Sequence, residues 1–168
     1  MALASKFAVL GVPESYDLSS EELDKKFREL SLRLHPDRFA KAPPAERVAA
    51  LSRSSALNDA YRTLKSPVGR AEHLLELAGI PIGEGEHVDQ GFLMEILELR
   101  EELAQAKAGG DAAKLAALGA AITARRDEAL ARLPVLFNEG RHAEAKEALI
   151  ALRYFQRFLD ELEGKEAE

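Results

Sequence analysis

The clearest pattern of hydrophobic and polar positions lies between Ser19 and Pro36. Apolar side chains recur after four, three and four residues, which places them on one face of a helix: Leu23, Phe27, Leu30 and Leu34. Ser19 and Glu22 have the spacing of a capping box, in which hydroxyl and carboxylate each bind a free backbone N–H at the helix start. Pro36 ends the helix, because the residue before a proline is disfavoured in the α conformation.

Three more helices are predicted in the first half of the chain. A short one covers 6–10, and a long one covers about 44–64, antiparallel to the helix that Pro36 ends. The long helix is expected to turn one set of side chains inward: Val48, Leu51, Leu57, Ala60, Tyr61 and Leu64. Ser66 and Pro67 are typical of an N-cap and a first helical position, so a further helix begins there and ends near Gly79.

A stretch rich in glycine and proline divides the chain. Residues 79–88 hold three glycines and one proline between two strongly periodic segments, a composition typical of loops. We therefore predict a helical domain over 1–79, a linker over 80–88 and a second helical domain over 89–168.

The second domain is predicted to contain three helices. Asp89 can cap a helix that runs to about Ala108, and Asp111 can cap a second helix that Pro134 ends or kinks. A third helix is predicted over 142–162, with an inward stripe of Ala145, Ala148, Leu152, Phe155, Leu159 and Leu162. Short connections between long helices favour an antiparallel bundle, so the predicted fold class is all-α.

Composition narrows the functional classes. The 168 residues are 46% hydrophobic and 31% charged, as in an ordinary soluble protein of one or two small domains. The chain has no cysteine, which excludes disulfides, thiolate metal ligands and thiol nucleophiles and fits a reducing cytoplasm. A net charge of −6 disfavours bulk attraction to nucleic acid or to an anionic membrane. No apolar run is long enough to span a bilayer, and the N-terminus does not have the pattern of a signal peptide.

The sharpest local signal is the tripeptide His35-Pro36-Asp37 at the break between two helices. By itself it is equally typical of a helix stop. Residues 25–41 also contain six lysines or arginines against two acids, a local charge of +4 in a protein of −6. This asymmetry favours an acidic partner surface, although a run of charge is more often simply a solvated face.

Together these features resemble a J domain, the module by which DnaJ-type co-chaperones drive ATP hydrolysis in DnaK-class chaperones. The matching parts are the short first helix, the basic helix, the loop 35–39 (HPDRF) and the antiparallel helix that ends NDAYRTL. Segments 10–13 (LGVP), 66–75 (SPVGRAEHLL) and 92–103 (FLMEILELREEL) resemble one branch, the HscB-type co-chaperones of iron–sulfur cluster assembly. The resemblance covers residues 5 to about 162 and implies an L-shaped arrangement of J domain and three-helix bundle.

The resemblance also implies two protein partners, an HscA- or DnaK-type ATPase and an IscU-type scaffold on which the cluster is built. The residues that would face the ATPase are Lys25, Lys26, Arg28, Arg33, His35, Pro36, Asp37 and Arg38. In this role the cations would steer the encounter, and Asp37 would compete for charged contacts that restrain hydrolysis. Pro36 would fix the loop, and His35 would orient it.

The helix expected over 89–108 carries more apolar surface than a bundle needs. Phe92, Ile96, Leu99 and Leu103 suffice for a core face. A second strip of Leu93, Met94 and Leu97 lies about 90° or more from the centre of that face. It either packs against another part of the protein or is an exposed binding surface, with methionine as its adaptable contact.

The resemblance assigns this second strip to the scaffold, through Leu93, Met94, Leu97, Glu98, Arg100, Glu101 and Tyr154. Tyr154 lies about 130° from the centre of the core stripe on its own helix and is expected to face outward. Phe155 is the alternative aromatic contact, because a slip of one residue would exchange the two rings.

Other residues give no sign of catalysis, of a cofactor or of a metal site. The histidines at 35, 73, 87 and 142 lack the spacing of metal ligands, and His73 is predicted to be structural. Glu101 and Glu102 are adjacent on a helix and diverge by about 100°. We therefore expect that the protein is not an enzyme. Two alternatives remain, a J-protein with another client and a helical structural or regulatory protein in which His35-Pro36-Asp37 only stops a helix.

Overall fold

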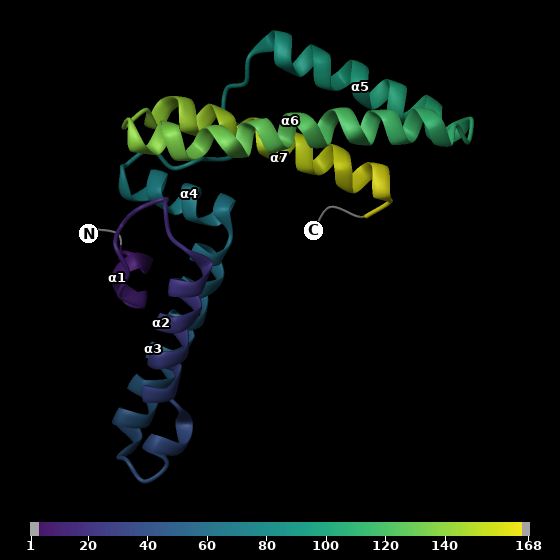
Figure 1. Cartoon of the computed structure of the whole chain (residues 1–168). Helices are drawn as coiled ribbons and strands as arrows, with labels where there is room; N and C mark the ends of the chain where they lie inside the picture. The colour runs from purple at the N-terminus through teal and green to yellow at the C-terminus, as the bar shows by residue number, and fades with distance from the viewer. Residues whose placement is uncertain (1–3, 166–168) are drawn as a thin grey trace. The chain divides into compact units, whose positions relative to one another are not determined.

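The computed structural model describes residues 4–165, and these form α-helices joined by short connections (Figure 1), which confirms the all-α fold class. The chain divides into two compact units that join between Pro81 and Ile82. No helix in the described part of the chain is long and apolar enough to cross a membrane.

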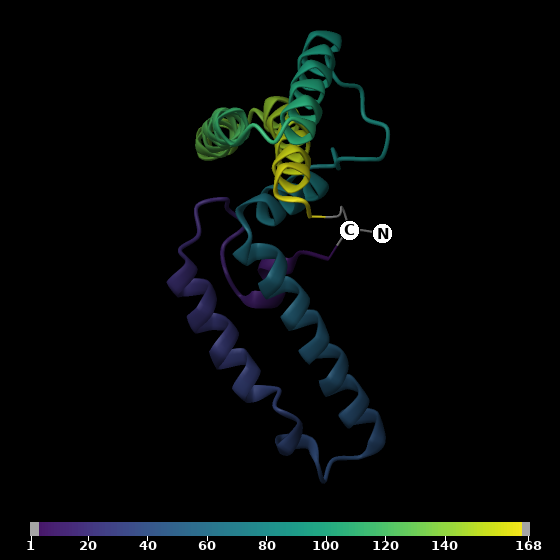
Figure 2. The same ribbon diagram turned by 90° about the vertical axis from the view of Figure 1, so that its right-hand side faces the viewer.

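The first unit is built around a helical hairpin. Its elements are α1 (Lys6–Leu10), α2 (Ser20–Arg33), the 3-10 helix η1 (Pro36–Phe39), α3 (Pro44–Lys65) and α4 (Pro67–Leu77). Helices α2 and α3 run antiparallel and are joined at one end by the loop that contains η1 (Figure 2). Helix α1 packs against α3 and α2 at the other end.

Serine side chains cap the helix starts where the sequence predicts them, although only the hydroxyl half of the predicted capping box at Ser19 is formed. The Ser19 hydroxyl accepts a hydrogen bond of 3.0 Å from the backbone N–H of Glu22. Ser66 ends α3 and also caps α4, where its hydroxyl accepts a bond of 3.2 Å from the N–H of Gly69. A Ser cap of this kind stabilises a helix by about 1 kcal/mol.

The core of the first unit joins α1, α2 and α3. Its fully buried members are Phe7, Leu10, Leu23, Leu57 and Leu64. The predicted stripe of α2 packs on this core, with Leu23 buried and the other three members partly buried. Complete burial of each such side chain contributes about 1.5–3 kcal/mol.

The predicted inner face of α3 is wrong at two positions. Val48 is 68% exposed and Leu51 is 69% exposed. Successive residues of a helix turn by 100°, so Leu51 and Val48 lie about 120° and 180° from Leu57 and face away from the core. Ala50 lies about 20° from Leu57 by the same count, and it is the residue that is buried there.

Two polar side chains of α4 are buried, Arg70 and His73. Arg70 donates to the carbonyl oxygens of Leu64 at 3.0 Å and Tyr16 at 2.7 Å, and its guanidinium lies 5.4 Å from the centre of the Tyr16 ring. Burial lowers the pKa of Arg70, because a charged group is poorly solvated there. The arginine thus ties the loop before α2 to the α3–α4 junction.

The second unit contains α5 (Gln90–Ala108), α6 (Ala112–Asn138) and α7 (His142–Glu163). Helices α6 and α7 pack along each other, and α5 packs mainly on α6. The predicted caps are confirmed, since Asp89 accepts from the N–H of Phe92 and Asp111 from that of Lys114. Helix α6 does not end at Pro134 but continues to Asn138.

The core of this bundle includes Ile96 and Leu103 of α5, Leu118 and Ile122 of α6, and Phe155, Phe158 and Leu159 of α7. Before α5, Glu86 accepts a hydrogen bond from the N–H of Gly83 and pairs with Lys146 of α7 at 2.9 Å. Both contacts lower the pKa of Glu86 and hold this segment on α7.

Candidate protein-binding surfaces

His35, Pro36 and Asp37 form an exposed turn where α2 gives way to η1. Nδ1 of His35 accepts a hydrogen bond of 3.2 Å from the backbone N–H of Asp37, which fixes the turn around Pro36. The Asp37 side chain is 92% exposed, with Oδ2 at 3.5 Å from the same imidazole nitrogen. The turn therefore presents a solvated carboxylate on a constrained backbone.

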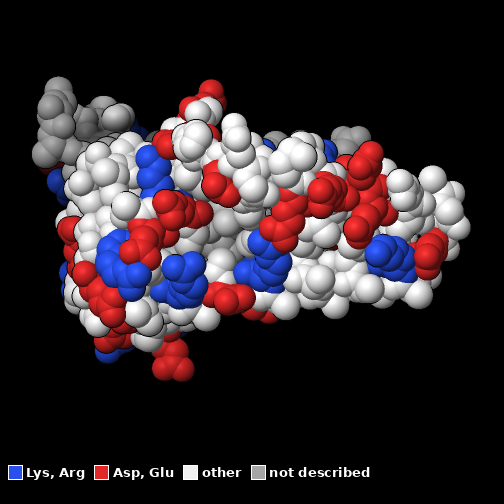
Figure 3. All heavy atoms as spheres, turned by 90° about the horizontal axis from the view of Figure 1, so that it is seen from above, with Lys and Arg blue, Asp and Glu red and all other residues white. Residues whose placement is uncertain are grey.

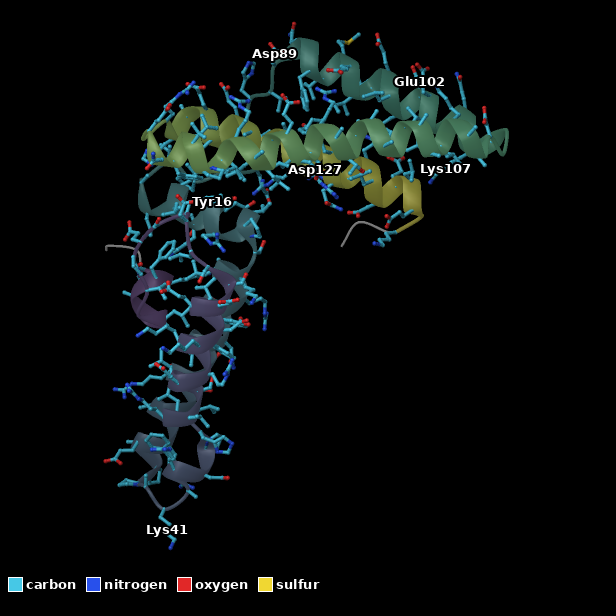
Figure 4. All side chains as sticks on the ribbon, viewed as in Figure 1. Tyr16, Lys41, Asp89, Glu102, Lys107 and Asp127 are labelled. Carbon is cyan, nitrogen blue, oxygen red and sulfur yellow. The ribbon has the colours of Figure 1, made fainter. Side chains whose placement is uncertain are left out.

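The cations predicted to face a partner are exposed along α2 and in η1. They are Lys25, Lys26, Arg28 and Arg33 on α2 and Arg38 in η1. None of the five forms an ion pair with a carboxylate among residues 4–165. Figure 4 shows Lys41 at the tip of the same loop, with its side chain pointing away from the helices. Unpaired cations in a group create the positive potential that an acidic partner would sense.

Asp24, on α2 beside these cations, has a structural role. Oδ1 of Asp24 accepts a hydrogen bond of 2.5 Å from the Tyr61 hydroxyl and pairs with the Lys65 ammonium. The Tyr61 ring stacks on Phe27 with centroids 4.1 Å apart. The hydrogen bond from Lys65, and then that from Tyr61, lowers the pKa of Asp24. This network joins α2 to α3.

A small apolar cleft beside the turn was not predicted. It has a volume of about 180 Å³ and is lined by residues of the loop and of α3, among them Leu34, Pro36, Phe39, Ala50 and Leu51. The angular position of Leu51, counted from Leu57, is the sequence signal that shows this side chain facing away from the core.

The second apolar strip of α5 is exposed at its centre. Met94 and Leu97 are each 58% exposed, whereas Leu93 is half-buried. The alternative in which this strip packs against other helices therefore does not hold for Met94 and Leu97. Glu98 and Glu101 are exposed beside them, and Arg100 forms an ion pair of 3.2 Å with Glu161 of α7.

Charges of both signs surround this strip. Of the exposed carboxylates of α5, Glu98 and Glu101 lie beside the strip, whereas Glu95 and Glu102 lie on the other side of the helix and pair with Arg125 and Lys114 of α6. The face drawn in Figure 3 carries Asp and Glu side chains in a band, with Lys and Arg side chains beside it. An apolar centre with a charged border is typical of a protein-binding surface.

The two neighbouring aromatic residues of α7 have different environments. Phe155 is 3% exposed and belongs to the core, so the accessible ring is that of Tyr154. The prediction that Tyr154 faces outward is only partly right. The ring is half-buried and meets the edge of Phe92, with centroids 5.6 Å apart, because α5 covers this side of α7.

No group of three or more His, Asp or Glu side chains within residues 4–165 is placed to hold a metal ion. His73 is buried, and its Nε2 accepts a hydrogen bond from the backbone of Lys6, which confirms the structural role predicted for it.

Comparisons with known proteins agree with this architecture. Residues 5–73 match the model of the DnaJ domain, and residues 88–163 match the HSCB C-terminal oligomerisation domain. A co-chaperone protein HscB homolog of Vibrio vulnificus is 37% identical over 160 residues, which are 94% of each chain.

Two solved structures share the fold over nearly the whole chain. Chaperone HscB from Vibrio cholerae is 36% identical, with a TM-score of 0.82 and 96% of both chains covered. Human co-chaperone protein HscB is 28% identical, with a TM-score of 0.85, and the match covers 97% of this chain and 82% of the human chain. The chain therefore belongs to the HscB family of J-domain co-chaperones, which act in iron–sulfur cluster assembly.

Proposed function

We propose that residues 1–79 bind an HscA- or DnaK-type chaperone and stimulate its ATPase, while residues 89–168 hold an IscU-type scaffold and deliver it to that chaperone. The observation that carries the proposal is the exposed His35-Pro36-Asp37 turn at the end of the α2–α3 hairpin, in a chain of the HscB family.

The turn supplies the chemistry of stimulation. Asp37 competes for cationic groups that restrain hydrolysis in the resting chaperone, since its own carboxylate is solvated and is bound by no lysine or arginine of residues 4–165. His35 holds the backbone N–H of Asp37, and Pro36 limits the turn to one geometry. The exposed cations of α2 accelerate the encounter with an acidic surface, an effect that salt weakens.

The strip on α5 supplies the scaffold contact. Met94 and Leu97 are the apolar centre, and Leu93 and Tyr154 extend it at its buried edge. Glu98, Arg100 and Glu101 form a charged border that sets the register of the partner. Methionine adapts to an irregular partner surface, because its unbranched side chain is flexible.

Delivery follows from having both sites on one chain. When the scaffold is bound to α5 and the chaperone to the turn, each partner meets the other at an effective concentration set by the tether rather than by the solution. The absence of cysteine fits a reducing compartment, and the proposal places this work in the cytoplasm. No step requires the protein to carry a cofactor or to catalyse a reaction.

Steady-state ATPase turnover of the chaperone, with and without scaffold, tests the proposal. His35→Gln is expected to abolish stimulation and to leave the urea midpoint unchanged, because the side chain is 56% exposed. His87→Gln, at an exposed histidine of the other unit, is the matched control. Normal stimulation by the His35→Gln variant would contradict the chaperone role. Retention of the scaffold by Leu93→Ala/Leu97→Ala in a pull-down would point instead to another client.

A further inference from the structure

A groove lies between α5 and α7 in the second unit. Its volume is about 240 Å³. Helix α5 contributes Ile96 and Arg100 to the lining. The remaining lining residues are Tyr154, Arg157, Phe158, Asp160 and Glu161 of α7 and Lys165 after it. A cavity of about 150 Å³ accepts a benzene ring. The groove therefore has room for one apolar side chain of a partner.

The groove has an apolar floor. Phe158 and Ile96 belong to the buried core of the bundle and close the bottom of the groove. Tyr154 forms part of the wall, where its ring is half-buried. A partner side chain placed here would cover apolar surface that water now contacts, which favours binding.

The groove continues the exposed strip of α5. Leu93, Leu97 and Arg100 follow one another at i, i+4 and i+7 and lie on one face of the helix. Arg100 is also a lining residue of the groove. A partner that covers Leu97 therefore reaches the groove within one helical turn.

Arg157 is the cation available at the rim of the groove. Its side chain is exposed, it lies 5.9 Å from the centre of the Tyr154 ring, and it pairs with no carboxylate of residues 4–165. Arg100, by contrast, is already paired with Glu161, whose carbonyl oxygen also accepts a bond from Lys107. The cation–π contact keeps Arg157 beside the groove without neutralising it.

We propose that this groove is a second part of the scaffold-binding surface, in which an apolar side chain of the scaffold enters and a neighbouring carboxylate of the scaffold pairs with Arg157. The inference rests on the proposed function of α5. Glu98 and Glu101 border the strip with negative charge, whereas Arg157 is positive. Asp160 and Glu161 also line the groove, and Glu161 already pairs with Arg100. Arg157 is therefore the cation left for a carboxylate of the scaffold.

The test is the dissociation constant of the full chain for cluster-free scaffold at low and at high salt. Arg157→Glu is expected to weaken binding by about 2- to 5-fold at low salt and by less at high salt, as an exposed charge pair does. Lys114→Glu is the control with the same change of charge. Lys114 pairs with Glu102, which lies on α5 about 180° from Leu93. Because this ion pair lies away from the strip, Lys114→Glu should change binding by less than about 2-fold.

Leu97→Ala separates the two proposals. If Leu97→Ala weakens binding and Arg157→Glu does not, the groove proposal is overturned and the function of α5 stands. If neither weakens binding, the proposed function fails together with the inference. If Arg157→Glu changes the sedimentation mass of the protein but not its affinity for the scaffold, the groove is a contact between copies of this chain, and the inference is again overturned.

Discussion

The backbone N–H of Lys6 donates a hydrogen bond of 3.0 Å to Nε2 of His73, a residue 67 positions away. This donor belongs to the first turn of α1, where a helix has no internal partner for it. The imidazole stacks on Phe7 with centroids 5.6 Å apart and is otherwise buried. Because Nε2 accepts, the proton of the neutral ring is on Nδ1, which lies 3.5 Å from Glu76.

His73→Phe is expected to destabilise the protein by about 1–3 kcal/mol, because it keeps an aromatic ring but leaves the Lys6 donor without its acceptor. Urea unfolding measures the loss, and exchange of the Lys6 amide hydrogen locates it. His87→Phe, at an exposed site, should change stability by less than about 0.5 kcal/mol. A His73→Phe variant as stable as the parent would show that the hydrogen bond does not contribute.

Asp24 should contribute to the pH dependence of the free energy of unfolding. Its pKa is lowered from the usual 3.8, so the charged form binds Lys65 and Tyr61 in the folded state and not in the unfolded chain. The stabilisation is complete above the unfolded pKa and is lost as the pH falls through the folded pKa. Asp24→Asn should therefore lower the urea midpoint at pH 7, and its deficit should shrink as the solution is made acidic below about pH 4. A deficit that does not change with pH would contradict the charged network.

Two glycines inside helices are expected to respond oppositely to alanine. A Cβ at Gly69 would lie 2.6 Å from the backbone oxygen of Thr63, which cannot move aside, so Gly69→Ala should cost about 1–3 kcal/mol. A Cβ at Gly119 would make ordinary contacts of 3.6 Å with Leu162, so Gly119→Ala should stabilise α6 by about 0.5–1 kcal/mol. Thermal or urea unfolding of each variant gives the sign directly. Equal changes in stability for the two variants would contradict the close approach of Gly69 to the backbone of Thr63 at the α3–α4 junction.

Tyr154 and Phe155 should separate binding from folding. Phe155→Ala is expected to cost about 3–5 kcal/mol of stability, because the ring fills the core of the bundle. Tyr154→Ala should weaken scaffold binding while it costs less stability, since the ring is only half-buried. Chemical unfolding and a scaffold titration on both variants check this. The reverse order of the two stability losses would exchange the roles assigned to the rings.

The parts of the fold that depend on neighbours in sequence were predictable. Caps at Ser19, Ser66, Asp89 and Asp111 act within three residues, so their side chains mark the helix starts without any tertiary information. The surplus of apolar residues on α5 was also visible in the sequence, but it left open whether the second strip is packed or exposed, and the exposure of Met94 and Leu97 decides this.

The parts that depend on distant packing were not predictable. Tyr154 is half-buried because α5 covers it, and the spacing of residues along α7 alone does not report that neighbour. The continuation of α6 through Pro134 agrees with the burial of Leu133 and Leu136 on either side, which offsets the hydrogen bond that proline removes. Burial of Arg70 had no sequence signal, since arginine is usually a surface residue.

Ser66 belongs to two helices at once, and the passage from α3 to α4 has no other residue. One inserted residue would rotate α4 by about 100° about its axis and would carry Gly69, Arg70 and His73 away from their partners. The loop between α2 and α3 does not fix the rotation of either helix about its own axis in this way, because it contains several residues besides the single turn of η1. Insertions and deletions should therefore accumulate among relatives within 40–43, after the turn and before α3, and be absent at Ser66, where chain length itself is under constraint.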